Sequence, residues 1–210
     1  MKEKVLIIGA GGHAKVVVDI LLEQKKYEVV GFVDRDSEKE YRGIKVIGQD
    51  EELSLFYKNG IRKVFVALGS NKIRKKLQIE CKNIGFDIIN IISSRATISP
   101  TVKLGNGIVI MDGAIVHADA VVKDGCIINT NASVDHDCCI DEYTHIAPGT
   151  AISGYTAVGR ECFIGTGCSI IDGITIGDHV TVGAGGVVVK DIIDSGIAVG
   201  IPAKIKKKNI

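Results

Sequence analysis

The stretch that decides the fold is residues 128–152, INTNASVDHDCCIDEYTHIAPGTAI, in which every sixth residue is aliphatic. The same period continues without interruption from residue 98 to residue 188. A period of six fits neither an α-helix, with about 3.6 residues per turn, nor a single alternating strand. The sixteen register residues are all Ile, Leu or Val: Ile98, Leu104, Ile110, Val116, Val122, Ile128, Val134, Ile140, Ile146, Ile152, Val158, Ile164, Ile170, Ile176, Val182 and Val188.

This period predicts a chain that forms a short strand, turns a corner and repeats. Three such sides make a coil of eighteen residues, and successive coils stack as parallel strands about 4.8 Å apart. The register residue of each side points inward and builds aliphatic ladders along the axis. Gly or Asp often follows it, where the corner needs permissive backbone angles. We therefore predict a parallel β-solenoid of about five coils.

The coil length also predicts which residues stack on one another. Asp135-His136-Asp137 follows the register residue Val134, and Gly154 falls one coil after His136. A glycine there leaves a backbone N–H unobstructed beside the imidazole. Acyl transfer needs this pairing of a general base with a donor for the developing oxyanion. A histidine in an acidic surface turn is the alternative, and spacing alone does not separate the two.

Residues 1–94 have a different pattern, in which strands and helices alternate. This alternation predicts a small Rossmann-like parallel sheet built from βαβ units, in a domain over residues 1–94 that precedes a solenoid domain over 95–210. The expected strands cover residues 5–8, 28–33, 45–47, 63–68 and 87–91, and the expected helices cover 13–24, 50–58 and 71–84.

A glycine-rich turn follows the first expected strand. Residues 9–14, GAGGHA, match the pattern G-x-G-x-x-A, Asp34 closes the second strand, and Gly69 follows a third. These positions suit a phosphate at a helix N-terminus and a ribose-binding acid at the same sheet edge, so we favour a nucleotide or nucleotide-sugar pocket. The alternative is that the glycines only let strand and helix pack closely. His13 either contacts the ligand or only caps the helix.

Composition argues against several classes of partner. The net charge is +1 and Trp is absent, which does not favour nucleic acid or an anionic membrane surface. The apolar run near the N-terminus is too short for a signal peptide, and no segment approaches the roughly twenty apolar residues of a membrane span. Cys126, Cys138, Cys162 and Cys168 occupy a repeat position reserved for small residues, so we interpret them as buried hydrophobes in a reducing cytoplasm, without a metal.

Several motifs together resemble those of a known family. They are residues 9–13, Asp34, Gly69-Ser70-Asn71 with Arg74-Lys75-Lys76, Asn129-Thr130, His136-Asp137, His145 and residues 199–204, VGIPAK. The whole chain thereby resembles the NeuD/PglD-type bacterial sugar acetyltransferases, a branch of the left-handed β-helix, or hexapeptide-repeat, acyltransferases. That resemblance implies the left hand of the solenoid and a cytoplasmic homotrimer with its site between neighbouring β-helices.

The resemblance also implies roles for individual residues. His136 is implied as general base, Asp137 as the group that raises its basicity, and Gly154 as the oxyanion donor. The family often has Glu at the position of Asp137, and the shorter Asp side chain has less reach toward the imidazole. The implied acetyl-CoA contacts are His145, Thr166 and Ala184, and the implied nucleotide-sugar contacts are Gly11, Gly12, His13, Asp34, Arg35 and Gly69.

The expected function is an acetyl-CoA-dependent N-acetyltransferase that acts on the amine of a nucleotide-linked amino-deoxy sugar, with UDP as the favoured nucleotide. O-acetylation of sialic acid is the alternative within the same class. The hypothesis of an NAD-dependent oxidoreductase is supported only by residues 9–14 and Asp34. A hexapeptide-repeat carbonic anhydrase needs three histidines around zinc, and His117 lies nineteen residues before His136. A scaffold without catalysis is the remaining interpretation.

Overall fold

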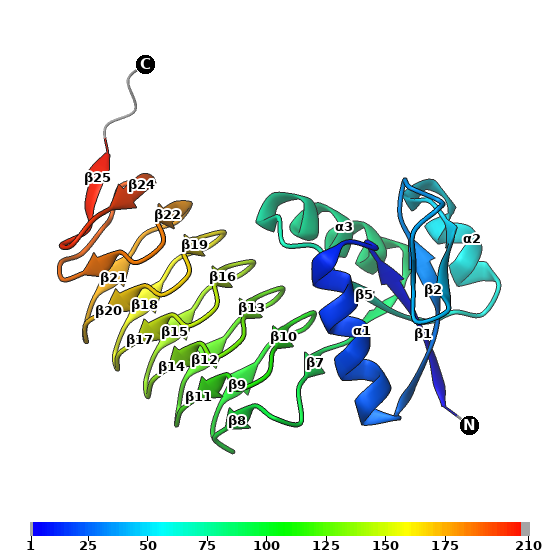
Figure 1. Cartoon of the computed structure of the whole chain (residues 1–210), viewed down its shortest axis with the longest axis horizontal. Helices are drawn as coiled ribbons and strands as arrows, with labels where there is room; N and C mark the ends of the chain where they lie inside the picture. Colours follow the sequence, from blue (N-terminus) through cyan, green and yellow to red (C-terminus); the bar gives the residue numbers. More distant parts are fainter. Residues whose placement is uncertain (1, 207–210) are drawn as a thin grey trace. The chain divides into compact units, whose positions relative to one another are not determined.

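The computed structural model describes residues 2–206, and the chain separates into two compact units, Met1–Ile91 and Ile92–Ile210. Figure 1 shows the elements of each unit. The first unit alternates strands and helices, and the second consists of short strands. Among the described residues, no helix is long and apolar enough to cross a membrane.

The first unit is built on a six-stranded sheet with the order β3-β4-β2-β1-β5-β6. Its pairs are parallel except for β3 with β4. The elements are β1 (Glu3–Ile8), α1 (Gly12–Gln24), β2 (Tyr27–Val33), β3 (Glu40–Tyr41), β4 (Ile44–Gly48), the 3-10 helix η1 (Asp50–Glu52), α2 (Leu53–Lys58), β5 (Lys63–Val66), α3 (Asn71–Ile84) and β6 (Asp87–Ile88). The Rossmann-like parallel sheet predicted from the sequence is confirmed.

Strand β1 lies at the centre of this sheet because its last four residues, 5–8, are fully apolar and buried. β2 pairs with one side of it and β5 with the other, so their carboxyl ends meet at one edge, where ligands of open α/β sheets bind. Gly9 turns the chain there with a φ of +97°, and a Cβ at this position would lie 2.7 Å from Leu68 Cδ2. Both the turn and the close approach require glycine.

Two expected elements differ in detail. The helix expected over residues 50–58 begins as the 3-10 turn η1, which a reciprocal capping box between Gln49 and Glu52 holds. The strand expected over 87–91 is two shorter strands, β6 and β7. The hairpin partner β3 was not foreseen, because two residues carry no periodicity.

The second unit is a parallel β-helix with three sheets: β7-β10-β13-β16-β19-β22-β24-β25, β8-β11-β14-β17-β20-β23 and β9-β12-β15-β18-β21. Its strands are β7 (Ile91–Ile92), β8 (Thr97–Ile98), β9 (Lys103–Leu104), β10 (Val109–Ile110), β11 (Ile115–Val116), β12 (Val121–Val122), β13 (Ile127–Ile128), β14 (Ser133–Val134), β15 (Cys139–Ile140), β16 (His145–Ile146), β17 (Ala151–Ile152), β18 (Ala157–Val158), β19 (Phe163–Ile164), β20 (Ser169–Ile170), β21 (Thr175–Ile176), β22 (Val180–Val182), β23 (Val187–Val188), β24 (Gly196–Val199) and β25 (Lys204–Lys206).

The eighteen-residue register holds from β8 to β23, and the last coil is shorter, since Val182 of β22 pairs with Ala198 of β24 sixteen residues later. Ile110 pairs with Ile128, which pairs with Ile146, and the other two sheets repeat this spacing. Every register residue from Ile110 to Val188 is at most 2 % exposed, so the aliphatic ladders form a continuous core. The six-residue pattern therefore predicted both the coil and its inward-facing residues.

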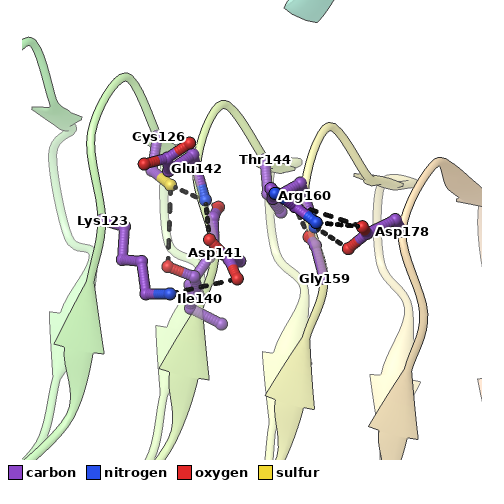
Figure 2. A network of polar contacts seen from close by, with 9 residues as sticks. All are labelled: Lys123, Cys126, Ile140, Asp141, Glu142, Thr144, Gly159, Arg160 and Asp178. Carbon is purple, nitrogen blue, oxygen red and sulfur yellow. Dashed lines mark hydrogen bonds and ion pairs between the residues drawn. The ribbon is translucent and has the colours of Figure 1, made fainter.

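The small-residue position has a second role that the hydrophobic interpretation missed. Cys and Thr side chains there donate to the carbonyl fifteen residues later, as Cys162 Sγ does to Gly177 O at 3.0 Å and Thr150 Oγ1 to Gly165 O at 2.9 Å. Figure 2 shows two of these contacts, from Cys126 and Thr144. Burial raises the pKa of the Cys162 thiol to about 11, so it stays protonated and able to donate.

On the outside of the same coils, ion pairs join residues one coil apart. Lys123 Nζ lies 3.1 Å from Asp141 Oδ2, and Arg160 Nη2 lies 2.9 Å from Asp178 Oδ2 (Figure 2). These side chains are partly solvated, so each pair adds little to stability. The Asp178 carboxylate also accepts the backbone N–H of Arg160 at 2.8 Å and thereby satisfies a corner amide.

Candidate functional site

His136 lies at the corner that follows β14, and a neighbouring carboxylate holds its ring. His136 Nδ1 is 2.9 Å from Asp137 Oδ2, so the shorter side chain does reach the imidazole. Asp137 adopts a φ of +57°, the left-handed conformation that recurs at every sixth residue from Gly107 to Gly185. The hydrogen bond to Asp137 raises the pKa of His136 above its ordinary value and outweighs the opposing effect of desolvation. With Nδ1 occupied in this way, Nε2 is the nitrogen left for a substrate.

Gly154 stacks on this imidazole, as the coil length predicted. A Cβ built on Gly154 would lie 2.6 Å from His136 Cε1 and 2.8 Å from Nε2, so the imidazole keeps this position only beside a glycine. Tyr155 N donates to His136 O at 3.1 Å, which fixes the two coils in register. Within residues 2–206, the Gly154 N–H donates to no other group and is available to a ligand.

Tyr155 is a contact of His136 that sequence reasoning missed. The two rings meet edge to face, with centroids 5.1 Å apart and planes at 85°. Tyr155 follows Asp137 by eighteen residues, so the coil length could have predicted that Tyr155 lies beside the His136-Asp137 pair. The Tyr155 ring, from the next coil, limits the rotation of the His136 side chain on one side. Asp137, from the same coil as His136, limits it through the hydrogen bond to Nδ1.

His145 lies on β16, in a different sheet from His136. Its ring is buried and packs edge to face on Phe163 of the next coil, with centroids 5.1 Å apart. Asn129 Nδ2 lies 3.0 Å from His145 Nε2, and Asn129 Oδ1 accepts the Thr130 N–H at 2.8 Å. The structure thus joins the Asn129-Thr130 motif to His145, which the sequence alone did not connect.

Thr166 and Ala184 stack one coil apart, as predicted. Gly185 N donates to Thr166 O at 2.8 Å, which aligns the two corners, and both residues are exposed. They follow strands β19 and β22, whereas His136 and Gly154 follow β14 and β17 of another sheet. One chain therefore presents these two groups at different corners of its β-helix.

In the first unit, Asp34 joins the glycine-rich turn to the end of β2. Its Oδ2 accepts the Ala10 N–H at 2.8 Å, and its Oδ1 accepts the Asp36 N–H at 3.1 Å and lies 3.0 Å from Lys39 Nζ. Partial burial alone would raise the pKa of Asp34, but the two N–H donors and Lys39 outweigh it, so the pKa is lowered. Asp34 is therefore ionised and already committed to three partners.

A cavity of about 300 Å³ lies where β1, β2 and β5 end. Of the residues implied as nucleotide-sugar contacts, the structure brings Asp34, Arg35 and Gly69 together in its wall. Gly11 and Gly12 do not line it; both are exposed, with open space where a side chain would begin.

His13 occupies the first turn of α1, beside the buried Arg74. The cap of α1 is Gly11, and no side chain caps the helix, which removes the capping interpretation of His13. Its Nε2 is buried and has no hydrogen-bond partner among the residues that the structure describes. Burial, and then the charge of Arg74, lower the pKa of His13 to about 4, so the ring is neutral at physiological pH.

Arg74 fixes the loop that carries Gly69. Its guanidinium is 1 % exposed and donates to Leu68 O at 3.0 Å, to Gly69 O at 3.2 Å and to Asn71 Oδ1 at 2.8 Å. The Arg74-Lys75-Lys76 motif thus contributes a structural arginine. In the described part of one chain, no three His, Cys, Asp or Glu side chains are close enough to hold a metal, so the ligands of the zinc alternative are not assembled there.

Comparison with known proteins places the chain in a family. Residues 4–80 match the model of the PglD N-terminal domain. A perosamine N-acetyltransferase variant from Caulobacter crescentus, solved with CoA and GDP-perosamine, is 42 % identical, with 98 % of this chain and 97 % of that chain covered and a TM-score of 0.95. The acetyltransferase domain of PglB from Neisseria gonorrhoeae is 40 % identical, with coverage of 98 % and 100 % and a TM-score of 0.94.

WeeI from Acinetobacter baumannii is 25 % identical, with coverage of 98 % and 100 % and a TM-score of 0.89. Protein L142 of Acanthamoeba polyphaga mimivirus is 35 % identical over 117 residues, which are 55 % of this chain and only 23 % of the viral protein. The chain belongs to the NeuD/PglD-type sugar acetyltransferases, and its solenoid is the left-handed β-helix of that family.

Proposed function

We propose that this protein is an acetyl-CoA-dependent N-acetyltransferase that acts on the amine of a nucleotide-linked amino-deoxy sugar. The observation that carries the proposal is the stack of Gly154 on His136, whose Nδ1 is held by Asp137 at 2.9 Å. A ring fixed through Nδ1 has one free nitrogen, beside an unused backbone N–H. Those are the general base and the oxyanion donor of acyl transfer.

In the proposed reaction, the sugar amine attacks the thioester carbonyl of acetyl-CoA while His136 Nε2 removes its proton. The Gly154 N–H stabilises the oxyanion of the tetrahedral intermediate. Collapse of this intermediate breaks the C–S bond, and the imidazolium returns the proton to the departing CoA thiolate. Asp137 stabilises the imidazolium throughout, because its carboxylate faces Nδ1.

Acetyl-CoA is proposed to lie along the β-helix on His145, Thr166 and Ala184. CoA or acetyl-CoA is bound in solved relatives, at 42 % and 39 % identity, which supports this co-substrate. In one chain, Thr166 and Ala184 lie at a different corner from His136 and Gly154. A homotrimer, with the site between neighbouring β-helices, would bring the two corners together.

The first domain, residues 1–94, is proposed to bind the nucleotide-sugar, and residues 95–210 to carry the transferase, in the cytoplasm. The proposed contacts are Gly11, Gly12, His13, Asp34, Arg35 and Gly69. The ordered glycine turn and the cavity beside it support this division of labour. The sequence favoured UDP, whereas a relative was solved in complex with GDP-perosamine.

A panel of acceptors tests the proposed reaction. The panel contains GDP-linked and UDP-linked amino sugars, each tested with acetyl-CoA. We expect release of the CoA thiol only with nucleotide-linked amino sugars, because the proposed base activates an amine. Free sialic acid and CMP-sialic acid supply hydroxyl acceptors. The nucleotide-linked sugars that lack the amine serve as controls. Release of CoA with sialic acid but with no amino sugar would replace N-acetylation by O-acetylation.

The contact between Asp137 and His136 predicts a change in pH dependence. Asp137→Asn removes the main group that raises the pKa of His136, so that pKa falls. Because only the neutral ring acts as base, the acidic limb of the kcat/KM profile should move to lower pH. The weaker base should lower the plateau of kcat about tenfold or more. Profiles that coincide for both proteins across the acidic limb would contradict this role for Asp137.

A further inference from the structure

A second carboxylate, from Asp50, lines the cavity at the ends of β1, β2 and β5. The cavity walls beside it are mainly aliphatic, with Leu68, Ile73 and Leu77 among them. Asp50 lies two residues after Gly48, whose carbonyl accepts the Asp34 N–H at 3.1 Å. This hydrogen bond keeps the start of the Asp50 segment at the same sheet edge. An apolar slot with a carboxylate in its wall suits a flat ring that carries hydrogen-bond donors on one edge.

The two acids of this cavity are not equivalent. The oxygens of Asp34 are taken by Ala10, Asp36 and Lys39. The Asp50 carboxylate, by contrast, makes no hydrogen bond or ion pair with any residue in the range 2–206, although the residue is half-buried.

Asp50 is also not needed for the turn on which it lies. Glu52 makes the reciprocal capping contact with Gln49, with its Oε2 accepting the Gln49 N–H at 2.8 Å. Burial, and then the charge of Glu51, raise the pKa of Asp50, which Arg35 opposes. A carboxylate that loses solvent without gaining a donor is stabilised by a ligand that supplies one.

The nucleobases differ in what they offer to a carboxylate. Guanine presents N1–H and N2–H side by side, and two parallel donors match the two oxygens of Asp. Uracil presents one N3–H between two carbonyl oxygens, which repel a carboxylate. Adenine presents a single amino group beside an unprotonated N1.

We infer that Asp50 accepts the N1–H and N2–H of a guanine base, so that the acceptor of this enzyme is a GDP-linked amino sugar. This inference rests on the proposed function, in which the first domain binds the nucleotide. It replaces UDP, the nucleotide that the sequence favoured. Asp34 remains at the sheet edge, with the glycine turn.

The experiment compares GDP, inosine diphosphate and UDP as ligands of the full chain and of Asp50→Asn, by calorimetry. Inosine diphosphate lacks only the 2-amino group, and Asn keeps the size of Asp while losing one acceptor. The wild-type protein should bind GDP about tenfold more tightly than inosine diphosphate or UDP, since one bidentate pair gives a discrimination of that order. In Asp50→Asn, GDP affinity should fall about tenfold, and the affinities of the other two should change little.

Glu51→Gln is the matched control, because it removes the same charge from the adjacent, exposed residue. It should keep the preference for GDP. Thermal unfolding of all three proteins checks that the first domain is intact.

Three results would overturn the inference. Wild-type affinity for UDP equal to or above that for GDP excludes guanine recognition. An equal loss for all three ligands in Asp50→Asn would assign Asp50 to the ribose hydroxyls instead. Both results leave the proposed acetyl transfer intact. No binding of any nucleotide would overturn the inference together with the proposed role of the first domain.

Discussion

Replacing His136 by alanine should lower kcat by about 10²–10⁴-fold, the range that a positioned general base contributes. The side chain packs on the Tyr155 ring, but it is 48 % exposed and lies at a corner outside the aliphatic core, so its loss should cost little stability. Binding of acetyl-CoA should change little, because His136 is not among the proposed CoA contacts. The measurement is steady-state CoA release with the best acceptor of the panel.

His117→Ala is the matched control. His117 is an exposed histidine nineteen residues earlier, at the corresponding corner one coil away. It has no stacked glycine, and we expect its replacement to leave kcat roughly unchanged. Turnover of His136→Ala within about threefold of wild type would be incompatible with general base catalysis by this ring.

The β-helix could be predicted in detail because its period is a constraint on position. Once sixteen aliphatic residues recur every six positions, any residue has a defined neighbour eighteen residues away. That rule predicts Gly154 over His136 and Ala184 over Thr166, and the structure confirms both stacks.

Contacts that depend on torsion angles lay beyond this rule. The positive φ of Asp137 belongs to the repeat, since it recurs at every sixth residue from Gly107 to Gly185, but the repeat does not fix the side-chain torsion angles that bring its carboxylate to the imidazole. The register gives the neighbours of Cys162 but not the direction of its thiol, so its hydrogen bond to Gly177 O could not be foreseen.

The first domain was predictable only at a coarser level. Hydrophobic periodicity and glycines indicated the sheet and the edge where a ligand would bind. The cavity, however, is lined from several separate segments, and their convergence depends on tertiary packing. Asp50 is one of three consecutive acids at the start of a helix, and the sequence does not show that Glu52 rather than Asp50 forms the capping contact with Gln49.

Gly154→Ala should lower kcat about 10²-fold or more while the fold is kept. The added Cβ would lie 2.6 Å from His136 Cε1, below van der Waals contact, so the imidazole must move away. The His136 Nε2 is then displaced from its position beside the acceptor amine and the Gly154 N–H. Displacing a catalytic group by about 1 Å can lower turnover about 10²-fold. Measuring kcat and the thermal midpoint together distinguishes a displaced base from a damaged β-helix.

The effect on stability should be small for two reasons. Gly154 is not among the glycines with positive φ, so alanine can adopt its backbone conformation. The group that must yield is a half-exposed side chain rather than the backbone of the next coil. Ser153→Ala, at the preceding residue, is the matched control and should retain both activity and stability. Because Gly154→Ala removes neither the histidine nor the N–H, wild-type turnover in this variant would show that their alignment in the stack does not govern the reaction.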